Sequence, residues 1–247
     1  MPLQRTQPVL ASFPSEHLTI AAGVAIFHLA TERVVLCYHT RDKYPFLPKG
    51  RRNANEDTGQ AAEREGFEES GYRNRLLPLP LIHRQPDRDE GHEDFVTEPL
   101  WTQLLPVSRR TQYLLHWYIA ETVPKSVEEE YGRMYRDKED LKPYKPPAPF
   151  PKGQTIEARI EEDWEVRDGD GSRQMYEPVR HDGTGVDEEE ALYESSLVSI
   201  EEARRRLGKS SAMDIIEKAI EYIHYRKRME LGTADPPTRD ASLGYWE

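Results

Sequence analysis

The stretch that decides the fold is Leu47–Tyr72, LPKGRRNANEDTGQAAEREGFEESGY. A basic, glycine-containing loop opens it, and Glu65, Glu68 and Glu69 follow at positions i, i+3 and i+4. Residues three and four apart share one face of an α-helix, so these carboxylates would converge on a helix. Like charges at this spacing disfavour a helix by roughly a few tenths of a kcal/mol per pair. Either solvent screens them or a cation holds them together.

The flanking residues predict where this helix begins and ends. Asp57 or Thr58 is suited to cap its N-terminus, and Gly71 is suited to end it after Ser70. Ligands with only oxygen donors suit hard cations such as Mg²⁺ or Mn²⁺, not zinc. A helix of this kind therefore predicts a site for a hard divalent cation.

The rest of the chain supplies strands before the helix and both strands and helices after it. Apolar, β-branched runs predict buried strands at 18–29, 33–39 and 112–123, and an extended edge segment at 75–85. Near the end of the chain, residues 191–207 predict a strand leading into a helix, and an amphipathic helix follows at about 212–227.

Composition changes sharply between residues 124 and 185, where the chain is first proline-rich and then acidic and polar. Such composition is typical of a partly disordered insertion. We therefore expect one domain at 18–227, interrupted by a flexible insertion at about 124–185. An N-terminal extension at 1–17 and a loose tail at 228–247 complete the chain.

Bulk composition limits the classes of function. The formal net charge of −11 argues against nucleic acid as the main partner, because phosphate backbones need a basic surface. A small polyanion remains compatible, since a few local Arg and Lys side chains can hold it. The single cysteine, Cys37, fits a reducing compartment, and the sequence shows neither a secretory signal nor a bilayer-spanning run. We expect a cytoplasmic or nuclear protein that is not secreted and has no membrane partner.

The spacing of the acidic stretch resembles that of the Nudix box. The matching positions are Gly50, Glu56, Arg64-Glu65, Glu68-Glu69 and Gly71. Two positions where the family usually has a bulky aliphatic residue hold Gly66 and Tyr72 instead. Gly66 lowers helix stability by roughly 1 kcal/mol relative to Ala, which predicts looser packing there.

The resemblance covers about residues 18–123 and 186–227 and implies an α/β (α+β) fold. In that fold a mixed β-sheet is sandwiched between helices, and the box forms a loop-helix-loop motif. It also implies hydrolysis of a pyrophosphate bond with Mg²⁺ as the cofactor, for which Mn²⁺ can substitute. The roles it assigns are metal binding by Gly50, Glu65, Glu68 and Glu69, catalysis by these three glutamates with Arg64, and a structural brace by Glu56.

Members of this family often take a further acidic ligand from a loop outside the box. Glu188, Glu189 and Glu190 are the candidates here, with Glu189, the central one, taken as the expected metal ligand. Glu93 and Glu98 are weaker alternatives. A solvated acidic loop is an equally good interpretation of the three consecutive glutamates.

The substrate is less well specified by the sequence. Five basic residues stand around the start of the box and are expected to bind substrate: Arg41, Lys43, Lys49, Arg51 and Arg52. The LPKG beginning resembles the branch that acts on diadenosine polyphosphates and diphosphoinositol polyphosphates. Ordinary surface basicity is the competing interpretation. A nucleotide sugar such as ADP-ribose is the alternative substrate.

The competing class of function is a catalytically silent Nudix module that binds a ligand or protein without turnover. Silent members usually lose glutamates of the box, whereas this chain keeps all of them, which favours an enzyme. The resemblance also suggests a homodimer, and the acidic insertion suggests a site for a protein partner.

Overall fold

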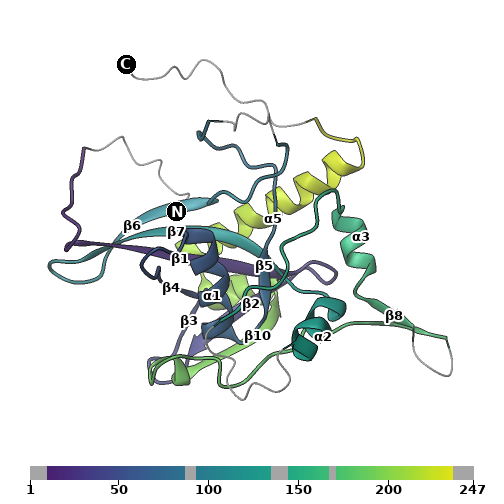
Figure 1. Cartoon of the computed structure of the whole chain (residues 1–247), viewed down its shortest axis with the longest axis horizontal. Coiled ribbons are helices and arrows are strands. Elements are labelled where there is room, and N and C mark those ends of the chain that lie inside the picture. The colour runs from purple at the N-terminus through teal and green to yellow at the C-terminus, as the bar shows by residue number, and fades with distance from the viewer. Residues whose placement is uncertain (1–9, 87–92, 135–143, 167–170, 236–247) are drawn as a thin grey trace.

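A central mixed β-sheet organises the computed structural model of the chain (Figure 1). The structure describes residues 10–86, 93–134, 144–166 and 171–235. The sheet runs in the order β10-β2-β1-β7-β5, with β3 beside β2, β4 beside β1 and β6 beside β7. The strands are β1 (Leu18–His28), β2 (Arg33–His39), β3 (Tyr44–Phe46), β4 (Lys49–Arg51), β5 (Asn74–Leu76), β6 (Trp101–Pro106), β7 (Gln112–Thr122) and β10 (Tyr193–Ser199).

Strand β1 is covered on both faces, which explains its almost continuous apolar sequence. It pairs in parallel with β7 along nearly its whole length and antiparallel with β2 and β4. Alternate residues of a strand face opposite sides of a sheet. In β1, Ala22, Val24 and Ile26 join one hydrophobic cluster, whereas Ala21 and Ala25 join the other.

Helices cover the two faces of this sheet. Helix α1 (Thr58–Ser70) contributes Ala61 and Ala62 to the smaller cluster. Helices α4 (Ile200–Leu207) and α5 (Ser211–Glu230) contribute to the larger cluster on the opposite face. The predicted arrangement of a mixed sheet between helices is therefore confirmed.

The predicted long strands agree closely with β1, β2 and β7, and the predicted final strand and helices with β10, α4 and α5. Three short or polar strands, β3, β4 and β6, were missed. Strand β6 is mostly exposed and lies against β7 by backbone pairing, so its sequence lacks an apolar periodicity that would predict it.

The insertion at 124–185 contains regular elements that its composition did not predict. They are α2 (Lys125–Met134), α3 (Ile156–Glu161), β8 (Trp164–Val166) and β9 (Arg173–Met175), and Figure 1 shows α2, α3 and β8 together to the right of the sheet. Phe150 and Ile156 belong to the larger hydrophobic cluster. Residues 135–143 and 167–170 lie outside the described residues, as do 1–9 and 236–247. The predicted flexibility of the insertion stays a prediction, which limited proteolysis would test.

A chain of buried charges ties α3 to the sheet. Glu121 of β7 lies 2.6 Å from Nε of Arg75 on β5 and 2.8 Å from Nε of Arg159 on α3. Nη1 of Arg159 lies 2.9 Å from Oδ1 of Asp163, and Oδ2 of Asp163 lies 3.3 Å from Nε2 of His28. We call these five residues the buried ion chain. Each is almost completely excluded from solvent, so Arg159 and Asp163 of the insertion are part of the packed interior at this end of the sheet.

Gly66 does not loosen the packing of α1, contrary to the sequence expectation. A Cβ at this position would lie 2.7 Å from Nδ2 of Asn74 and 2.8 Å from Cγ1 of Val24. The missing side chain instead lets the helix approach the sheet closely. The low helix propensity of glycine is offset here by a close helix–sheet contact.

Candidate active site

Local sequence signals fix the position of α1 and therefore of its carboxylates. Asp57 caps the helix by accepting a hydrogen bond of 2.8 Å from the backbone N–H of Gln60. Gly71 ends it in the left-handed conformation at φ 73°, where its own N–H donates to the Phe67 carbonyl. A Cβ on Gly71 would also collide with the His181 backbone, so this turn needs glycine for space as well as conformation.

Arg64 lies at the centre of the acidic residues of the box. Its guanidinium donates to both carboxylate oxygens of Glu56, at 2.8 and 3.0 Å. The Nη1 atom donates to Glu65 at 2.8 Å and to Glu68 at 2.7 Å, and the Nη2 atom donates to the Arg51 carbonyl at 2.9 Å. One planar fork of donors thus holds three carboxylates and the preceding loop in a fixed arrangement.

The loop before the helix closes over the carboxylates of Glu69 and Glu65. The backbone N–H of Lys49 donates to Oε2 of Glu69 at 2.7 Å. Gly50 lies so close to Glu65 that any added Cβ would overlap the carboxylate. Glycine at this position therefore lets β4 lie directly against the Glu65 side chain.

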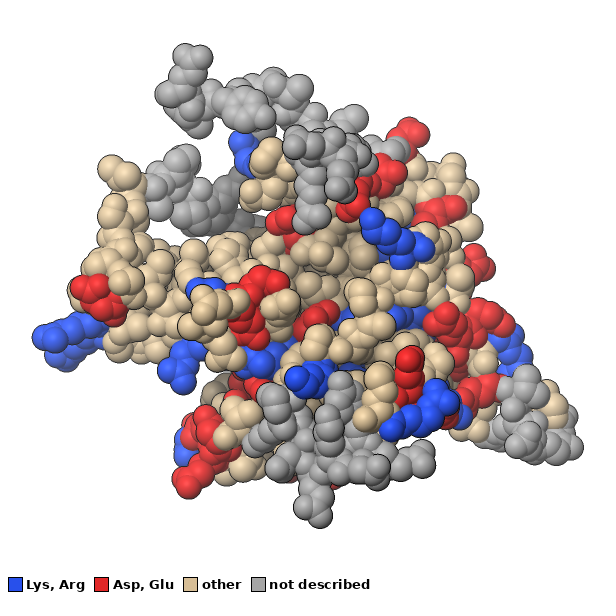
Figure 2. Space-filling view, viewed as in Figure 1, with Lys and Arg blue, Asp and Glu red and all other residues tan. Residues whose placement is uncertain are grey.

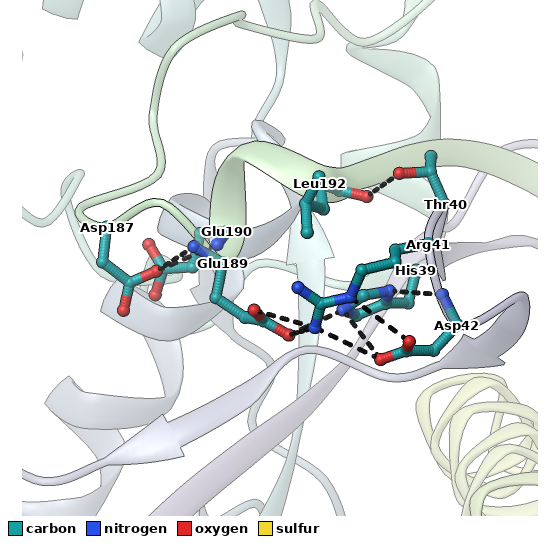
Figure 3. Close-up of polar contacts among 8 residues, drawn as sticks. All are labelled: His39, Thr40, Arg41, Asp42, Asp187, Glu189, Glu190 and Leu192. Atoms are coloured by element: carbon teal, nitrogen blue, oxygen red, sulfur yellow. Dashed lines mark hydrogen bonds and ion pairs between the residues drawn. The ribbon is translucent and has the colours of Figure 1, made fainter.

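A further carboxylate comes from the loop that precedes β10. Oxygen atoms of Glu65, Glu69 and Glu190 lie within 4.8 Å of one another. Asp187 sets this loop by accepting hydrogen bonds of 2.9 Å from the backbone N–H groups of Glu189 and Glu190 (Figure 3). We call Glu65, Glu68, Glu69 and Glu190 the carboxylate cluster.

The electrostatics of the cluster show an excess of negative charge. Burial raises the pKa of the Glu65 carboxyl to about 7 and that of Glu69 to about 8, although Arg64 and Lys49 respectively oppose these shifts. Burial also raises the pKa of Glu68. Charge repulsion from Glu190 adds to all three shifts. The cluster is therefore built to gain a cation, which would neutralise charges that the protein's own side chains leave uncompensated.

The donor set of this cluster consists of carboxylate oxygens, with the Gly50 backbone beside them. Such a set fits a hard divalent cation and lacks the nitrogen or sulfur donors that zinc prefers. A family model described as the NUDIX domain matches residues 17–137, which include the whole of α1. The chain belongs to the Nudix family.

Solved structures of Nudix proteins match the chain at low sequence identity. A NUDIX hydrolase from Nitrosomonas europaea is 15% identical, with a TM-score of 0.39 over 93% of this chain and 97% of that one. An Ap4A hydrolase from C. elegans is 13% identical, with a TM-score of 0.39 over 84% and 98%. A NUDIX-family hydrolase from Clostridium perfringens is 16% identical, with a TM-score of 0.40 over 84% and 97%. Curated protein sequences give no significant match to the chain.

The assignment rests on the domain match and on the complete set of box glutamates. With both in place, the chain is a Nudix pyrophosphohydrolase, and hydrolysis of a pyrophosphate bond is its general reaction. Its substrate is a small molecule that carries phosphate groups.

The structure separates the three acidic candidates at 188–190, in the loop that precedes β10. Glu190 joins Glu65 and Glu69, whereas Glu189 turns toward Nε2 of His39 at 2.8 Å. Glu188 is exposed. Glu190, and not Glu189, therefore lies with the carboxylates of the box, and the metal role of either residue stays a prediction.

The five predicted substrate-binding residues have different surroundings. Arg41 forms an ion pair of 2.7 Å with Glu189, and Arg52 donates to the Glu56 carbonyl at 2.7 Å. Lys49 lies above the Phe46 ring, with its ammonium 5.5 Å from the ring centre. Lys43 and Arg51 are exposed. The structure thus places Lys43, Lys49 and Arg51 as the residues freest to meet a polyphosphate, and their role stays a prediction.

His39 is a residue of the site that sequence reasoning did not identify. It is the last residue of β2 and is fully excluded from solvent, yet it contacts Glu189 in the loop that precedes β10. A lone histidine at a strand end gives no sequence signal, since its partner lies 150 positions away.

Charge on the molecular surface is mixed. On the face shown in Figure 2, Lys and Arg side chains are interspersed with Asp and Glu, without one continuous basic field. None of the helices among the described residues is long and apolar enough to cross a membrane.

Proposed function

We propose that the chain hydrolyses a pyrophosphate bond in a highly phosphorylated small molecule, with a divalent cation held by Glu65, Glu69 and Glu190. The observation that supports this most directly is the convergence of these three carboxylates within 4.8 Å. The raised pKa values of Glu65 and Glu69 give it a physical reason, because burial and repulsion from neighbouring carboxylates disfavour their charged forms, and a cation would offset both. Mg²⁺ is the proposed cofactor and Mn²⁺ its substitute.

The remaining residues of the Nudix box orient this ligand set. Glu68 shares the Nη1 atom of Arg64 with Glu65 and is placed to serve as a further ligand or to act on water. Glu56 holds the other side of the same guanidinium and acts as the brace. The Gly50 carbonyl is the proposed backbone ligand. When bound, the cation would polarise the phosphate oxygens and lower the pKa of its bound water.

Diphosphoinositol polyphosphates and diadenosine polyphosphates are the proposed substrates. Lys43, Lys49 and Arg51 lie on the loop that leads into the box, where several phosphates would need cationic partners. A nucleotide sugar such as ADP-ribose is the alternative substrate, and binding without turnover is the alternative function. A homodimer and a protein partner for the insertion stay predictions, which light scattering and co-purification would check.

Phosphorus NMR with the full chain and Mg²⁺ tests the proposal. The panel contains a diphosphoinositol polyphosphate, diadenosine tetra- and hexaphosphate, and ADP-ribose. Glu69→Gln is the inactive variant, because it removes one ligand charge while keeping the side-chain shape. Glu63→Gln is its matched control: Glu63 lies on the same helix, and burial raises its pKa to about 7, but it accepts from the Leu76 N–H instead.

We expect turnover of one polyphosphate class, a loss on the order of 100-fold or more in Glu69→Gln, and near-normal activity in Glu63→Gln. Preferential turnover of ADP-ribose would replace the proposed substrate class with the alternative. Binding of Mn²⁺ and of a panel member without turnover would instead identify a silent module. Equal activity in the two variants would show that Glu69 has no special role in the reaction.

A further inference from the structure

The loop that carries Glu190 is held at two points by the turn after β2 (Figure 3). The first point is Glu189, whose Oε1 lies 2.8 Å from Nε2 of His39 and 2.7 Å from the Arg41 guanidinium. Arg41 also reaches Oε2 of Glu189 at 3.1 Å. The second is the Leu192 carbonyl, which accepts from both the N–H and the hydroxyl of Thr40, at 3.0 and 2.8 Å. Glu190 lies between these two anchors.

The hydrogen bonds of His39 define its tautomer. The backbone N–H of Asp42 donates to Nδ1 at 3.0 Å, so Nδ1 is an acceptor and carries no proton. The proton of the neutral ring is therefore on Nε2, and this N–H donates a hydrogen bond to Glu189. His39 is fully buried and stacks on Tyr44 with ring centres 5.3 Å apart, so the direction of this donor is fixed by its surroundings.

Glu190 itself is held closely within the same loop. Its backbone N–H donates to Asp187, and its carboxylate accepts from the Val186 N–H. Its Cβ lies so close to Gly185 that a Cβ added there would be 2.8 Å away. The loop has little room to shift, so a displacement at Glu189 would be passed on to its neighbour Glu190.

We infer that His39 and Arg41 are positioning residues, which hold Glu189 and thereby fix Glu190 beside Glu65 and Glu69. This inference rests on the proposed metal role of Glu190. It gives Arg41 a different task from the substrate binding that its sequence position suggests, since its guanidinium is engaged by Glu189 and also by Asp42.

The group His39, Asp42 and Glu189 also has ligand atoms within 4.8 Å of one another, which is compatible with a second metal site. Its hydrogen bonds favour the positioning role. The Nδ1 atom is used by the Asp42 N–H, the Nε2 atom by Glu189, and both oxygens of Glu189 by Arg41. A cation there would have to displace a guanidinium that already neutralises the carboxylate.

Binding of Mn²⁺ alone to the full chain, followed by electron paramagnetic resonance, tests this inference without relying on turnover. Residues that orient a metal ligand through hydrogen bonds typically contribute 10- to 100-fold in affinity, so we expect Glu189→Ala to weaken Mn²⁺ binding by about 10-fold. Glu188→Ala is the matched control, because it removes the same charge from an exposed position of the same loop. Glu189 is itself 46% exposed, so its replacement should not prevent folding.

A double-mutant cycle separates positioning from general damage. If Glu189 acts through Glu190, adding Glu189→Ala to Glu190→Gln should weaken Mn²⁺ binding no further. Glu189→Gln, which keeps an acceptor for His39, should restore part of the affinity lost in Glu189→Ala. Arg41→Ala should weaken Mn²⁺ binding. If Arg41 bound substrate instead, the same substitution would raise KM and leave the Mn²⁺ affinity unchanged.

Additive losses in the double variant, or equal effects of Glu188→Ala and Glu189→Ala, would overturn the inference. Loss of a second bound Mn²⁺ in Glu189→Ala, with the first unaffected, would also overturn it and indicate a metal site at His39. An unchanged Mn²⁺ affinity in Glu190→Gln would instead contradict the metal role in the proposed function. The failure of each proposal is therefore recognisable separately.

Discussion

The carboxylate cluster and the buried ion chain both gather charged side chains, but they balance charge differently. In the buried ion chain, Arg75 and Arg159 match Glu121 and Asp163 one for one, and His28 ends the series. In the carboxylate cluster, four glutamates share Arg64 and Lys49, and Arg64 also serves Glu56.

The difference indicates what each region is for. A buried network with matched charges has no need of a ligand and fixes elements relative to one another. In a partly buried cluster with surplus negative charge, burial and mutual repulsion raise the pKa values of the carboxyl groups, so bound protons or cations would stabilise it. The balance of charge, more than its density, therefore distinguishes the proposed metal site from the structural network.

The largest expected effect comes from breaking the balance of the buried ion chain. Glu121→Gln leaves Arg75 and Arg159 without their shared carboxylate in a fully buried position. We expect the free energy of unfolding to fall by about 3–5 kcal/mol, measured by urea denaturation. Glu217→Gln, which removes the exposed partner of Arg204, is the control and should change it by less than about 1 kcal/mol. A change below about 1 kcal/mol in Glu121→Gln would show that this network is dispensable.

The next effect tests how closely α1 lies against the sheet. Gly66→Ala would bring a Cβ within 2.8 Å of Asn74 and Val24, so we expect a loss of about 1–3 kcal/mol in urea denaturation. Gly132→Ala in α2 is the matched control, since no atom lies within 4 Å of an added Cβ. There alanine should stabilise the protein by roughly 0.5–1 kcal/mol. Stabilisation by both substitutions would mean that helix propensity, not close packing, governs position 66.

The dependence of stability on pH tests the surplus charge of the cluster. The pKa values of Glu65 and Glu69, about 7 and 8, are raised above an unfolded value of 4.5, so the folded state binds protons more tightly. Metal-free stability should therefore fall as pH rises from about 4.5 through 8. Mg²⁺ should reverse this trend, because it binds the deprotonated carboxylates.

Melting temperatures between pH 5 and 9, with EDTA or with Mg²⁺, measure this effect. Glu69→Gln should flatten the metal-free profile and abolish most of the stabilisation by Mg²⁺. Glu63→Gln should also flatten the metal-free profile, because the pKa of Glu63 is about 7, but should leave the effect of Mg²⁺ intact. Stabilisation by Mg²⁺ that is independent of pH would contradict this account of the cluster.

The smallest expected effect concerns how exactly the loop before β10 positions Glu190. Gly185→Ala would crowd Glu190 and should weaken Mn²⁺ binding by several-fold, while the melting temperature in EDTA stays nearly constant. Gly132→Ala serves again as the control and should leave Mn²⁺ affinity unchanged. An unaltered affinity in Gly185→Ala would show that the loop adjusts freely around Glu190.

Much of the fold could be predicted because its signals are local. The apolar runs of β1, β2 and β7 and the caps Asp57 and Gly71 depend only on neighbouring residues. The elements of the insertion could not be predicted, because α3 is held by Arg159 and Ile156 through partners far away in the chain. The prediction of looser packing at Gly66 was wrong for a similar reason, because the absence of a side chain there allows close contact with Val24 and Asn74.

The sequence by itself determined the α1 helix, the spacing of its carboxylates and the family, because helical periodicity and capping are set within a few residues. Only the tertiary structure decided which loop glutamate meets the cluster and that Arg41 and His39 hold its neighbour. These contacts join residues about 150 positions apart, and their geometry depends on how β2 and β10 pair. Charge compensation follows distances in space, which spacing along the chain does not encode beyond a single helix.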